Sequence, residues 1–537
     1  MADLMIQHTA DGAQPLNPNP APNLIDRMPA ELINEIICYA LVGPLAEDHD
    51  DRILSILHVS SRWRKIALNS REFISNVPVP WPAASREQTE EWLLRTRPFP
   101  IRIRAPAYVE GVTLESDDYA DHPILGPLEV ALRNDNLLRV REIHIEGRRG
   151  EHEDHLRPIP VAVVLNHLVN LGSDVSLPLE ILRIRSDEPQ RLHYNATFPI
   201  PSSDAWPIFP SLRLVDVKGG EIPPYLPWFA SPALTTVLLE GVIEEGLWDS
   251  WDDLQCELAA FSDTVEILTL ETYTLPSDMN ADEAIPVLPN LRYLEVTDTP
   301  DAVAKLLHNV HFPYTTSFHF SFLLGREDLQ TYKTSTLPTD YWKLNTFQEL
   351  AIESSEPDRI SWIARPSSGV AQAGAVRLDV QGDPGFLPEH HEFLLTYSAR
   401  LLINVCRLVI RTPHFPSRAV WHALLLLAPI QEMVITSGNA LAGWMEAMPG
   451  PTGIPIPQFV IPRLVIMHTT FHGSEAFMHF AQFLRSGGSH GFGKVSFVGC
   501  TFEGMTREAF QTILKIIGCL VFCTGCRGRV DVSGDGM

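Results

Sequence analysis

Positive charge is scarce in this sequence of 537 residues. Lys and Arg total 41 against 66 Asp and Glu, which leaves a net charge of −25. The phosphate backbone of DNA or RNA would repel such a chain, so we expect no nucleic-acid partner. Apolar runs are also short: the longest, Ala423–Ile430, has eight residues, whereas a membrane span needs about 20. Because Met1–Ile6 does not resemble the start of a secretory signal peptide, we expect a soluble protein of the cytoplasm, the nucleus or both, with no membrane partner.

Cysteine is rare as well. Seven cysteines in a chain of this length are an odd number that suits a reducing compartment better than a disulfide framework. The closest set, Cys519, Cys523 and Cys526, offers three thiolates where a structural zinc site usually needs four ligands; a cysteine-bearing terminal repeat is the alternative interpretation. Two histidine pairs, at 152 and 155 and at 390 and 391, lie in acidic or proline-flanked segments that predict solvated loops. We therefore expect no metal site.

Motifs for catalysis are missing too. The sequence contains no phosphate-binding loop, no glycine-rich dinucleotide motif and no Gly-x-Ser-x-Gly nucleophile elbow. We therefore expect neither an enzymatic activity nor a cofactor. An enzyme with a cysteine-based or metal site near residues 519–526 is a hypothesis that the residue types hardly support.

Proline, by contrast, is frequent, with 44 residues or about 8% of the chain where about 5% is average. Since proline ends helices and interrupts central strands, we expect many short elements joined by turns. Residues 1–23 combine four prolines with Asn, Ala and Gln, and they offer too little apolar surface to offset the entropy lost on ordering. The sequence predicts a disordered leader over 1–23.

Residues 24–77 have the pattern of a small helical module. Apolar residues recur at three- and four-residue spacing in three stretches, which predicts three short amphipathic helices. These residues are Leu32, Ile33, Ile36, Ile37 and Leu41, then Ile53, Ile56 and Leu57, then Val59, Trp63, Ile66 and Ala67. A unit of roughly 50 residues has a marginal core. We therefore expect the module to contact a neighbouring domain or a partner protein.

Over residues 85–537, an apolar-x-x-apolar-x-apolar hexad recurs about every 29 residues. Its middle apolar residues are Ile143, Leu182, Val215, Val237, Leu268, Leu294, Phe318, Leu350, Leu378, Leu408, Met433, Leu464 and Val495. Helical patterns lie between several hexads, so strand and helix alternate, which requires parallel crossovers. The period is near the upper end for leucine-rich repeats. We predict an α/β fold in which 85–537 forms an irregular leucine-rich-repeat-like solenoid with a parallel sheet; an irregular two-domain α/β protein is the alternative.

Two segments of the helical module resemble a known family. Leu24–Ile36 is similar to the opening of an F-box, and Leu57–Leu68 is similar to its second half in the form common to a large fungal group of F-box-like proteins. In that group a Trp-Leu-x-Arg-[Ser/Thr] stretch often follows the box, and Trp92–Ile103 resembles it. Two departures are Met28, where Leu is usual, and Ser60, where Cys is common.

The resemblance implies a substrate-recognition subunit of a cullin-RING ubiquitin ligase. The helical module would dock on a Skp-type adaptor protein, and through it on a cullin, while the repeat domain would bind an unknown target protein. The positions implied for the adaptor contact are Met28, Pro29, Leu32, Ile36, Leu57, Val59 and Trp63. In the alternative interpretation Ile36, Leu57 and Trp63 belong to the core of the module itself. The alternative function is a non-catalytic interaction scaffold whose F-box-like module does not engage the ligase.

The residue after each middle hexad position is expected to face away from the core. Most of these residues are polar, but three of the last four are valines, Val409, Val434 and Val465. An exposed apolar stripe at these positions would offer a binding surface for the target protein. Alternatively the strands are covered on both faces, as the apolar strands of parallel sheets usually are.

Overall fold

The computed structural model describes most of the chain between residues 27 and 528. The described residues are 27–41, 49–79, 85–110, 122–147, 156–157, 159–169, 171, 175–186, 208–218, 230–240, 248, 250–271, 275–276, 287–332, 336–337, 347–356, 358–366, 374–382, 387–414, 416–447, 461–486, 492–517 and 520–528. The disordered leader that we expect over 1–23 lies outside them.

The described residues form short helices and strands throughout, as the high proline content predicts. The α-helices are α1 (Ala30–Ala40), α2 (His49–Val59), α3 (Ser61–Asn69), α4 (Arg71–Asn76), α5 (Arg86–Arg95), α6 (Leu125–Ala131), α7 (Asn134–Leu137), α8 (Ile159–Val169), α9 (Trp251–Phe261), α10 (Pro300–Asn309), α11 (Arg326–Thr331), α12 (Leu387–Ser398), α13 (Arg418–Leu427), α14 (Gly438–Ala447), α15 (Gly473–Ser486) and α16 (Arg507–Ile517), with one 3-10 helix, η8 (Ala399–Leu402). In this part of the chain no helix has both the length and the apolar composition of a membrane span.

Most of the strands belong to one large sheet. The strands are β1 (Ile101–Pro106), β2 (Val109–Glu110), β3 (Val140–Gly147), β4 (Leu156–Arg157), β5 (Ile181–Ser186), β6 (Leu214–Lys218), β7 (Thr236–Glu240), β8 (Ile267–Glu271), β9 (Tyr293–Thr297), β10 (Ser317–Leu323), β11 (Phe347–Glu356), β12 (Arg359–Pro366), β13 (Val376–Gln381), β14 (Arg407–Ile410), β15 (Glu432–Ile435), β16 (Arg463–Met467), β17 (Thr470–His472), β18 (Lys494–Val498), β19 (Thr501–Glu503), β20 (Leu520–Thr524) and β21 (Arg527–Gly528). The large sheet has 16 strands in the order β1-β3-β5-β6-β7-β8-β9-β10-β13-β12-β11-β14-β15-β16-β18-β20.

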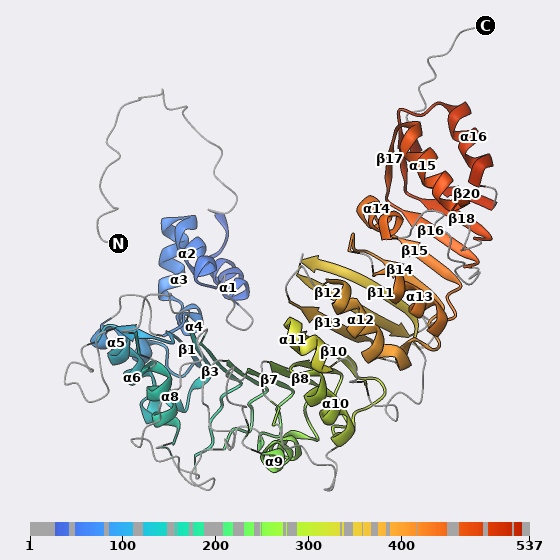
Figure 1. The fold of residues 1–537 in the computed structure, drawn as a ribbon. Helices are drawn as coiled ribbons and strands as arrows, with labels where there is room; N and C mark the ends of the chain where they lie inside the picture. The colour runs from blue at the N-terminus through green and yellow to red at the C-terminus, as the bar shows by residue number, and fades with distance from the viewer. Residues whose placement is uncertain are drawn as a thin grey trace, which may run out of the picture.

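The large sheet is mostly parallel. Its neighbouring strands run parallel except in the pairs β11–β12 and β12–β13. The predicted α/β fold is therefore confirmed, and the predicted parallel pairing is confirmed for most of the strands. Figure 1 shows the strands following a curved path, with α1–α4 near one end and α15 and α16 at the other, and with α8, α9 and α10 on the outer side of the curve.

The hexad residues lie side by side on adjacent strands of this sheet, almost as predicted. All thirteen middle residues lie on strands and are at most 4% exposed. Those from Ile143 to Phe318 are paired strand by strand, and so are those from Leu350 to Val495. The exception is Leu378, because Val376 rather than Leu378 pairs with Phe318. Apolar residues alternate along β13, so a shift by two residues preserves the pattern and the sequence did not distinguish the registers.

The prediction of a wholly parallel sheet is wrong at β11–β13. Only residues 357 and 358 separate β11 from β12, and nine residues separate β12 from β13. A parallel crossover needs about a dozen residues or more, whereas short connections join antiparallel strands. Strand β12 was not predicted, and it places β13 rather than β11 beside β10. The strand order therefore departs from the chain order at this point.

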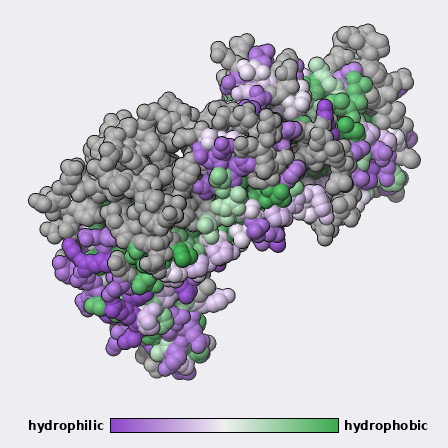
Figure 2. All heavy atoms as spheres, turned by 90° about the horizontal axis from the view of Figure 1, so that it is seen from below, coloured by the Kyte–Doolittle hydropathy of each residue, from purple (hydrophilic) through white to green (hydrophobic). Residues whose placement is uncertain are grey.

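Two separate apolar cores support the fold. The core of the sheet domain includes Val79 and Leu93 and extends along the strands and their helices to Ile517. The helical module has its own core, which runs from Ile33 to Val77. On the outer surface that Figure 2 views from below, hydrophilic and hydrophobic side chains are interspersed in the described part.

Candidate functional site

The helical module consists of four short helices rather than the three that we predict. The missed helix is α4, whose N-terminal Ser70 accepts a hydrogen bond from the Phe73 backbone N–H at 3.2 Å. In the same way Ser60 begins α3 by accepting a hydrogen bond from the Trp63 backbone N–H at 3.2 Å. Because a serine at this position satisfies a backbone N–H that the helix leaves unpaired, Ser60 has a local structural role.

The seven residues implied for the adaptor contact fall into two groups. Leu32, Ile36 and Val59 are exposed by 46%, 44% and 53%, and Pro29 is exposed as well. The others, Met28, Leu57 and Trp63, are partly buried against the core of the module. The alternative interpretation as core residues thus fits Leu57 and Trp63, whereas it is wrong for Ile36, whose neighbours Ile33 and Ile37 occupy the core instead.

The exposed residues of α1 form an apolar stripe. Leu32, Ile36 and Tyr39 follow one another at spacings of four and three residues, which places them on one side of the helix, and all three are exposed. We call these three residues the α1 stripe. Tyr39 was missed at the sequence level, although the same spacing would have identified it. Large apolar side chains that gather on one side of a helix while another side packs in a core are typical of a protein-binding surface.

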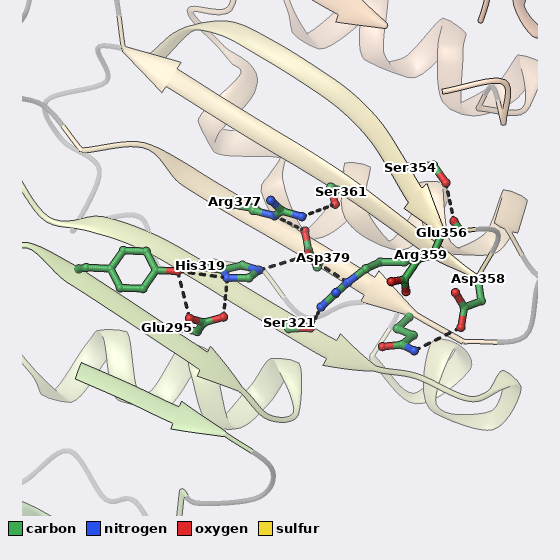
Figure 3. A network of polar contacts seen from close by, with 12 residues as sticks. Glu295, His319, Ser321, Ser354, Glu356, Asp358, Arg359, Ser361, Arg377 and Asp379 are labelled. Carbon is green, nitrogen blue, oxygen red and sulfur yellow. Dashed lines mark hydrogen bonds and ion pairs between the residues drawn. The ribbon is translucent and has the colours of Figure 1, made fainter. Parts of the chain in front are cut away.

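A second candidate surface is the polar face of the sheet around His319 (Figure 3). His319 Nδ1 lies 2.7 Å from Glu295 Oε1, and His319 Nε2 lies 3.1 Å from Asp379 Oδ2. Arg377 Nε donates to Asp379 Oδ1 at 2.9 Å, and Arg359 Nε lies 3.2 Å from Asp379 Oδ2. The residues come from four neighbouring strands, β9, β10, β13 and β12, which places a histidine between two carboxylates and two guanidinium groups on one carboxylate.

The charges in this cluster stabilise one another. Burial alone would lower the pKa of His319, but hydrogen bonds with Asp379 and Glu295 outweigh it and raise that pKa to about 9. Burial alone would raise the pKa of Asp379, but hydrogen bonds from His319 and Arg377 lower it to about 2. His319 is thus a cation and Asp379 an anion at neutral pH. Because each charge has partners inside the cluster, the arrangement is that of a structural ion-pair network and leaves no proton poised for transfer.

Similar pairs continue along the same face. Asp216 lies 2.8 Å from Arg183 Nε and 2.7 Å from Arg185 Nη2, and Lys218 Nζ lies 2.8 Å from Glu240. Charged side chains of opposite sign thus pair between β5 and β6 and between β6 and β7. Cross-strand pairs of opposite charge stabilise a sheet, so this face is both a structural feature and a polar surface.

The prediction of an exposed apolar stripe at the far end of this face is wrong. Val409, Val434 and Val465 are only 3%, 2% and 5% exposed, and they form a buried cluster with Ala351 and Ile363. These valines do lie side by side on adjacent strands, but they are not accessible to a partner. The alternative, strands covered on both faces, explains their burial because apolar side chains on both sides of a parallel strand favour contacts on both sides.

The structure also shows what the cysteines near the candidate zinc site contact. Cys500 donates from its thiol to Ile466 O and Val498 O, and Cys526 donates to Phe497 O. These thiols therefore bond to backbone oxygens at the ends of strands, which is a structural role; Cys519 lies outside the described residues. No group of three or more His, Cys, Asp or Glu side chains suited to a metal ion occurs in the part of the chain that the structure describes.

The solvated loops predicted for the histidine pairs have different outcomes. His390 and His391 lie on α12 and are at most 1% exposed, so the prediction of a solvated loop is wrong there. The reason is that Leu387–Ser398 packs as a helix against β12 and β13, and the proline at position 388 is tolerated in its first turn. The pair at 152 and 155 lies outside the described residues.

Comparison with known proteins does not assign the chain to a family. No protein-family model matches the chain, and no curated protein is significantly similar to it. The likeness to the F-box family therefore depends on the motif residues of the helical module and on how their side chains are displayed.

Proposed function

We propose that this protein is a non-catalytic recognition adaptor of a Skp- and cullin-type ubiquitin ligase. The helical module around α1–α4 would act as an F-box-like domain and dock on the Skp-type adaptor. The sheet domain would act as an irregular leucine-rich-repeat-like array that binds a target protein. Such a complex would work in the cytoplasm, the nucleus or both, and the chain itself would catalyse no step.

The observation that carries this proposal is the exposure of Leu32, Ile36 and Val59. Each is a large apolar side chain that is about half exposed on a helix that packs in the core of the module with other residues. Covering such side chains with a partner stabilises the complex by about 25 cal/mol per Å² of apolar surface, before the cost of association. These residues are among those that the resemblance implies for the adaptor contact.

The target would contact the polar side of the sheet domain. There the side chains of Arg185, Arg377 and Arg407 are 43%, 37% and 46% exposed, and their guanidinium groups are paired with carboxylates. A surface with both signs of charge suits the polar surface of a folded protein, and its pairs favour specificity more than raw affinity. The buried valines Val409, Val434 and Val465 have no part in this proposal.

The test is co-purification of the full-length chain with a Skp-type adaptor. We expect Leu32→Asp and Ile36→Asp to reduce recovery of the adaptor by at least tenfold, because each places a charge where apolar contact is needed. Leu426→Asp is the matched control. Because Leu426 is an exposed leucine on α13, away from the helical module, this variant should recover as much adaptor as the wild type does.

The same experiment separates the two functional hypotheses. Equal adaptor recovery for the wild type and both α1 variants, or no recovery at all, would support the interaction scaffold in which the module does not engage the ligase. Trp63→Ala tests the core contribution of the module, since Trp63 is partly buried against that core. We expect it to lower both the stability of the module and adaptor recovery.

A further inference from the structure

The neighbouring strands β18 and β20 lead into the same turn. They pair in parallel, and beyond the turn β19 and β21 pair with the same register. Each turn contains a glycine, Gly499 or Gly525, with a φ of 62°, a left-handed conformation that residues with side chains rarely adopt. The residues that follow these two glycines, Cys500 and Cys526, therefore lie side by side.

This turn places two cysteines on one side of the sheet. Phe497 and Cys500, three residues apart, are both 0% exposed in the core of the sheet domain. Their counterparts on the next strand are Cys523, which pairs with Phe497, and Cys526, which packs against the same core. In a straight strand, residues three positions apart point to opposite faces. The left-handed glycine between them is therefore what brings Cys523 and Cys526 to the same side.

The thiols of Cys523 and Cys526 lie close to each other. Cys526 Sγ donates to the backbone O of Phe497 at 3.4 Å, and Phe497 is the residue beside Cys523. Partial burial, followed by the neighbouring Cys526 thiol, raises the pKa of Cys523 to about 11, so the two side chains interact. Cys523 is exposed and Cys526 is partly exposed, whereas Cys500 is buried. Reagents in solution therefore reach this pair more readily than they reach Cys500.

The segment Cys523-Thr-Gly-Cys526 has the Cys-x-x-Cys spacing that is typical of dithiols which exchange with disulfides. We propose that Cys523 and Cys526 form a redox-active dithiol, which small disulfides such as glutathione disulfide convert into an intramolecular disulfide. Their position on the same side of the sheet, next to each other and accessible, is what supports this assignment. Cys500 keeps a structural role.

The reaction is thiol–disulfide exchange in two steps. Cys523 loses its proton to water, and its thiolate attacks one sulfur of glutathione disulfide; the S–S bond of that molecule breaks, and one glutathione leaves as a thiolate. Cys526, deprotonated in turn, attacks the Cys523 sulfur, and the second glutathione leaves. Two cysteine thiols are thus oxidised to one disulfide, one glutathione disulfide is reduced to two glutathiones, and the leaving thiolates take up the two protons.

Oxidation changes the contacts of the turn between β20 and β21. Cys526 donates a hydrogen bond to Phe497 O only in its reduced form, because a disulfide sulfur carries no proton. Cys500 retains its own hydrogen bonds to Ile466 O and Val498 O. We therefore expect the structural effect of the oxidant to be confined to this turn.

The first test is a peptide map of the full-length chain. A Cys519→Ser protein is reduced, incubated with glutathione disulfide at pH 8.5, alkylated and digested with trypsin. Because trypsin cleaves after Lys and Arg, it separates Cys500, in peptide 495–507, from the cysteine pair, in peptide 516–527. We expect peptide 516–527 to carry neither glutathione nor an alkyl group and to be lighter than the dithiol by two hydrogen atoms. Exposed Cys256 on α9 is the control and should carry one glutathione.

The same map contains the results that would overturn the proposal. Glutathione or alkyl groups on both cysteines of peptide 516–527 would show that the pair does not close, and a disulfide between peptides 516–527 and 495–507 would assign Cys526 to Cys500 instead. In a Cys526→Ser variant, Cys523 should stop at the mixed disulfide with glutathione. The wild-type chain, with the pair located by fragmentation of peptide 516–527, should give the same disulfide as Cys519→Ser.

A second measurement tests whether the fold holds the two thiols together. The equilibrium constant for oxidation of the pair by glutathione disulfide is measured in buffer and in urea that unfolds the chain. Because the folded turn keeps Cys523 and Cys526 on one side of the sheet, we expect the constant to be at least about tenfold larger for the folded protein. Equal constants would show that only the spacing in the sequence matters, which would contradict the proposal.

Discussion

Trp362 of β12 donates its indole N–H to Nδ1 of His391 on α12 at 3.2 Å, and both side chains are buried. The other ring nitrogen, Nε2, lies 3.2 Å from the backbone O of His414. Since Nδ1 accepts a hydrogen bond, the single proton of the ring is on Nε2 and His391 is neutral. The antiparallel strand that interrupts the parallel sheet is thus joined to its covering helix by an uncharged hydrogen bond.

This arrangement predicts sensitivity to acid. Burial lowers the pKa of His391 to about 3, whereas the pKa in the unfolded chain is about 6.5. Between these values the unfolded chain binds the proton and the folded chain does not, so stability falls as pH falls. From pH 6.5 to pH 5 we expect His391 to account for a loss of about 2 kcal/mol in the free energy of unfolding. Urea unfolding at each pH checks this.

The matched variant is His391→Gln, which keeps a polar side chain but cannot titrate. It should be less stable than the wild type at pH 7, and the difference should narrow as the pH approaches 5. A difference that does not change with pH would show that His391 is not the group responsible for the acid sensitivity.

The His319–Asp379 pair predicts the opposite dependence at higher pH. The pKa of His319 is raised to about 9, so the stabilisation from its charge is complete below about pH 6.5 and is lost as pH rises through 9. The pKa of Asp379 is lowered to about 2, so its contribution is present above about pH 3.8 and is lost as pH falls through 2.

We therefore expect Asp379→Asn to cost about 3 kcal/mol of stability near pH 6 and to cost less at pH 9.5. Chemical unfolding at the two pH values measures the difference. His472→Gln is the control: His472 pairs with Glu503 at 3.0 Å, but the two side chains are 77% and 56% exposed, and such pairs contribute little. An equal loss at both pH values for Asp379→Asn would refute the coupling.

Glu257 on α9 predicts a stabilising substitution. Its side chain is buried, and burial together with the nearby Asp253 raises its pKa to about 9. A carboxyl group with a raised pKa reduces stability above its unfolded value of about 4.3, because folding must keep it protonated or bury its charge. We expect Glu257→Gln to raise the free energy of unfolding by about 1–3 kcal/mol at pH 7 and to have little effect at pH 4. Thermal unfolding at both pH values checks this, with the exposed Asp252→Asn as the control.

Ser60 gives a prediction for the helical module. Because its side chain satisfies the Trp63 backbone N–H at the start of α3, Ser60→Ala should destabilise the module by about 1 kcal/mol. The adjacent Ser61→Ala, exposed within α3, should have almost no effect. Hydrogen exchange of the module amides distinguishes the two variants, and equal protection in both would show that the cap is unimportant.

Periodicity in the sequence was sufficient to predict the strands and helices that repeat. The hexads placed thirteen buried residues on strands, because apolar residues that recur at this spacing are typical of strands with one side in a core. The resemblance to the F-box, rather than periodicity, implied Leu32, Ile36 and Val59 as contact residues, and the structure exposes all three. The hexad pattern failed at Val409, Val434 and Val465, because a run of apolar residues is compatible with exposure on one face of the sheet or with burial on both.

What the sequence determined by itself is local: short elements where proline is frequent, the alternation of strand and helix, and the amphipathic helices of the module. Tertiary structure alone decided that β12 enters the sheet between β13 and β11, and that His319 contacts both Glu295 and Asp379. The physical reason is that periodicity reports which side of an element is apolar. Strand order and contacts such as that between His319 and Asp379, 60 positions apart, depend on how whole elements pack, and no local pattern contains that information.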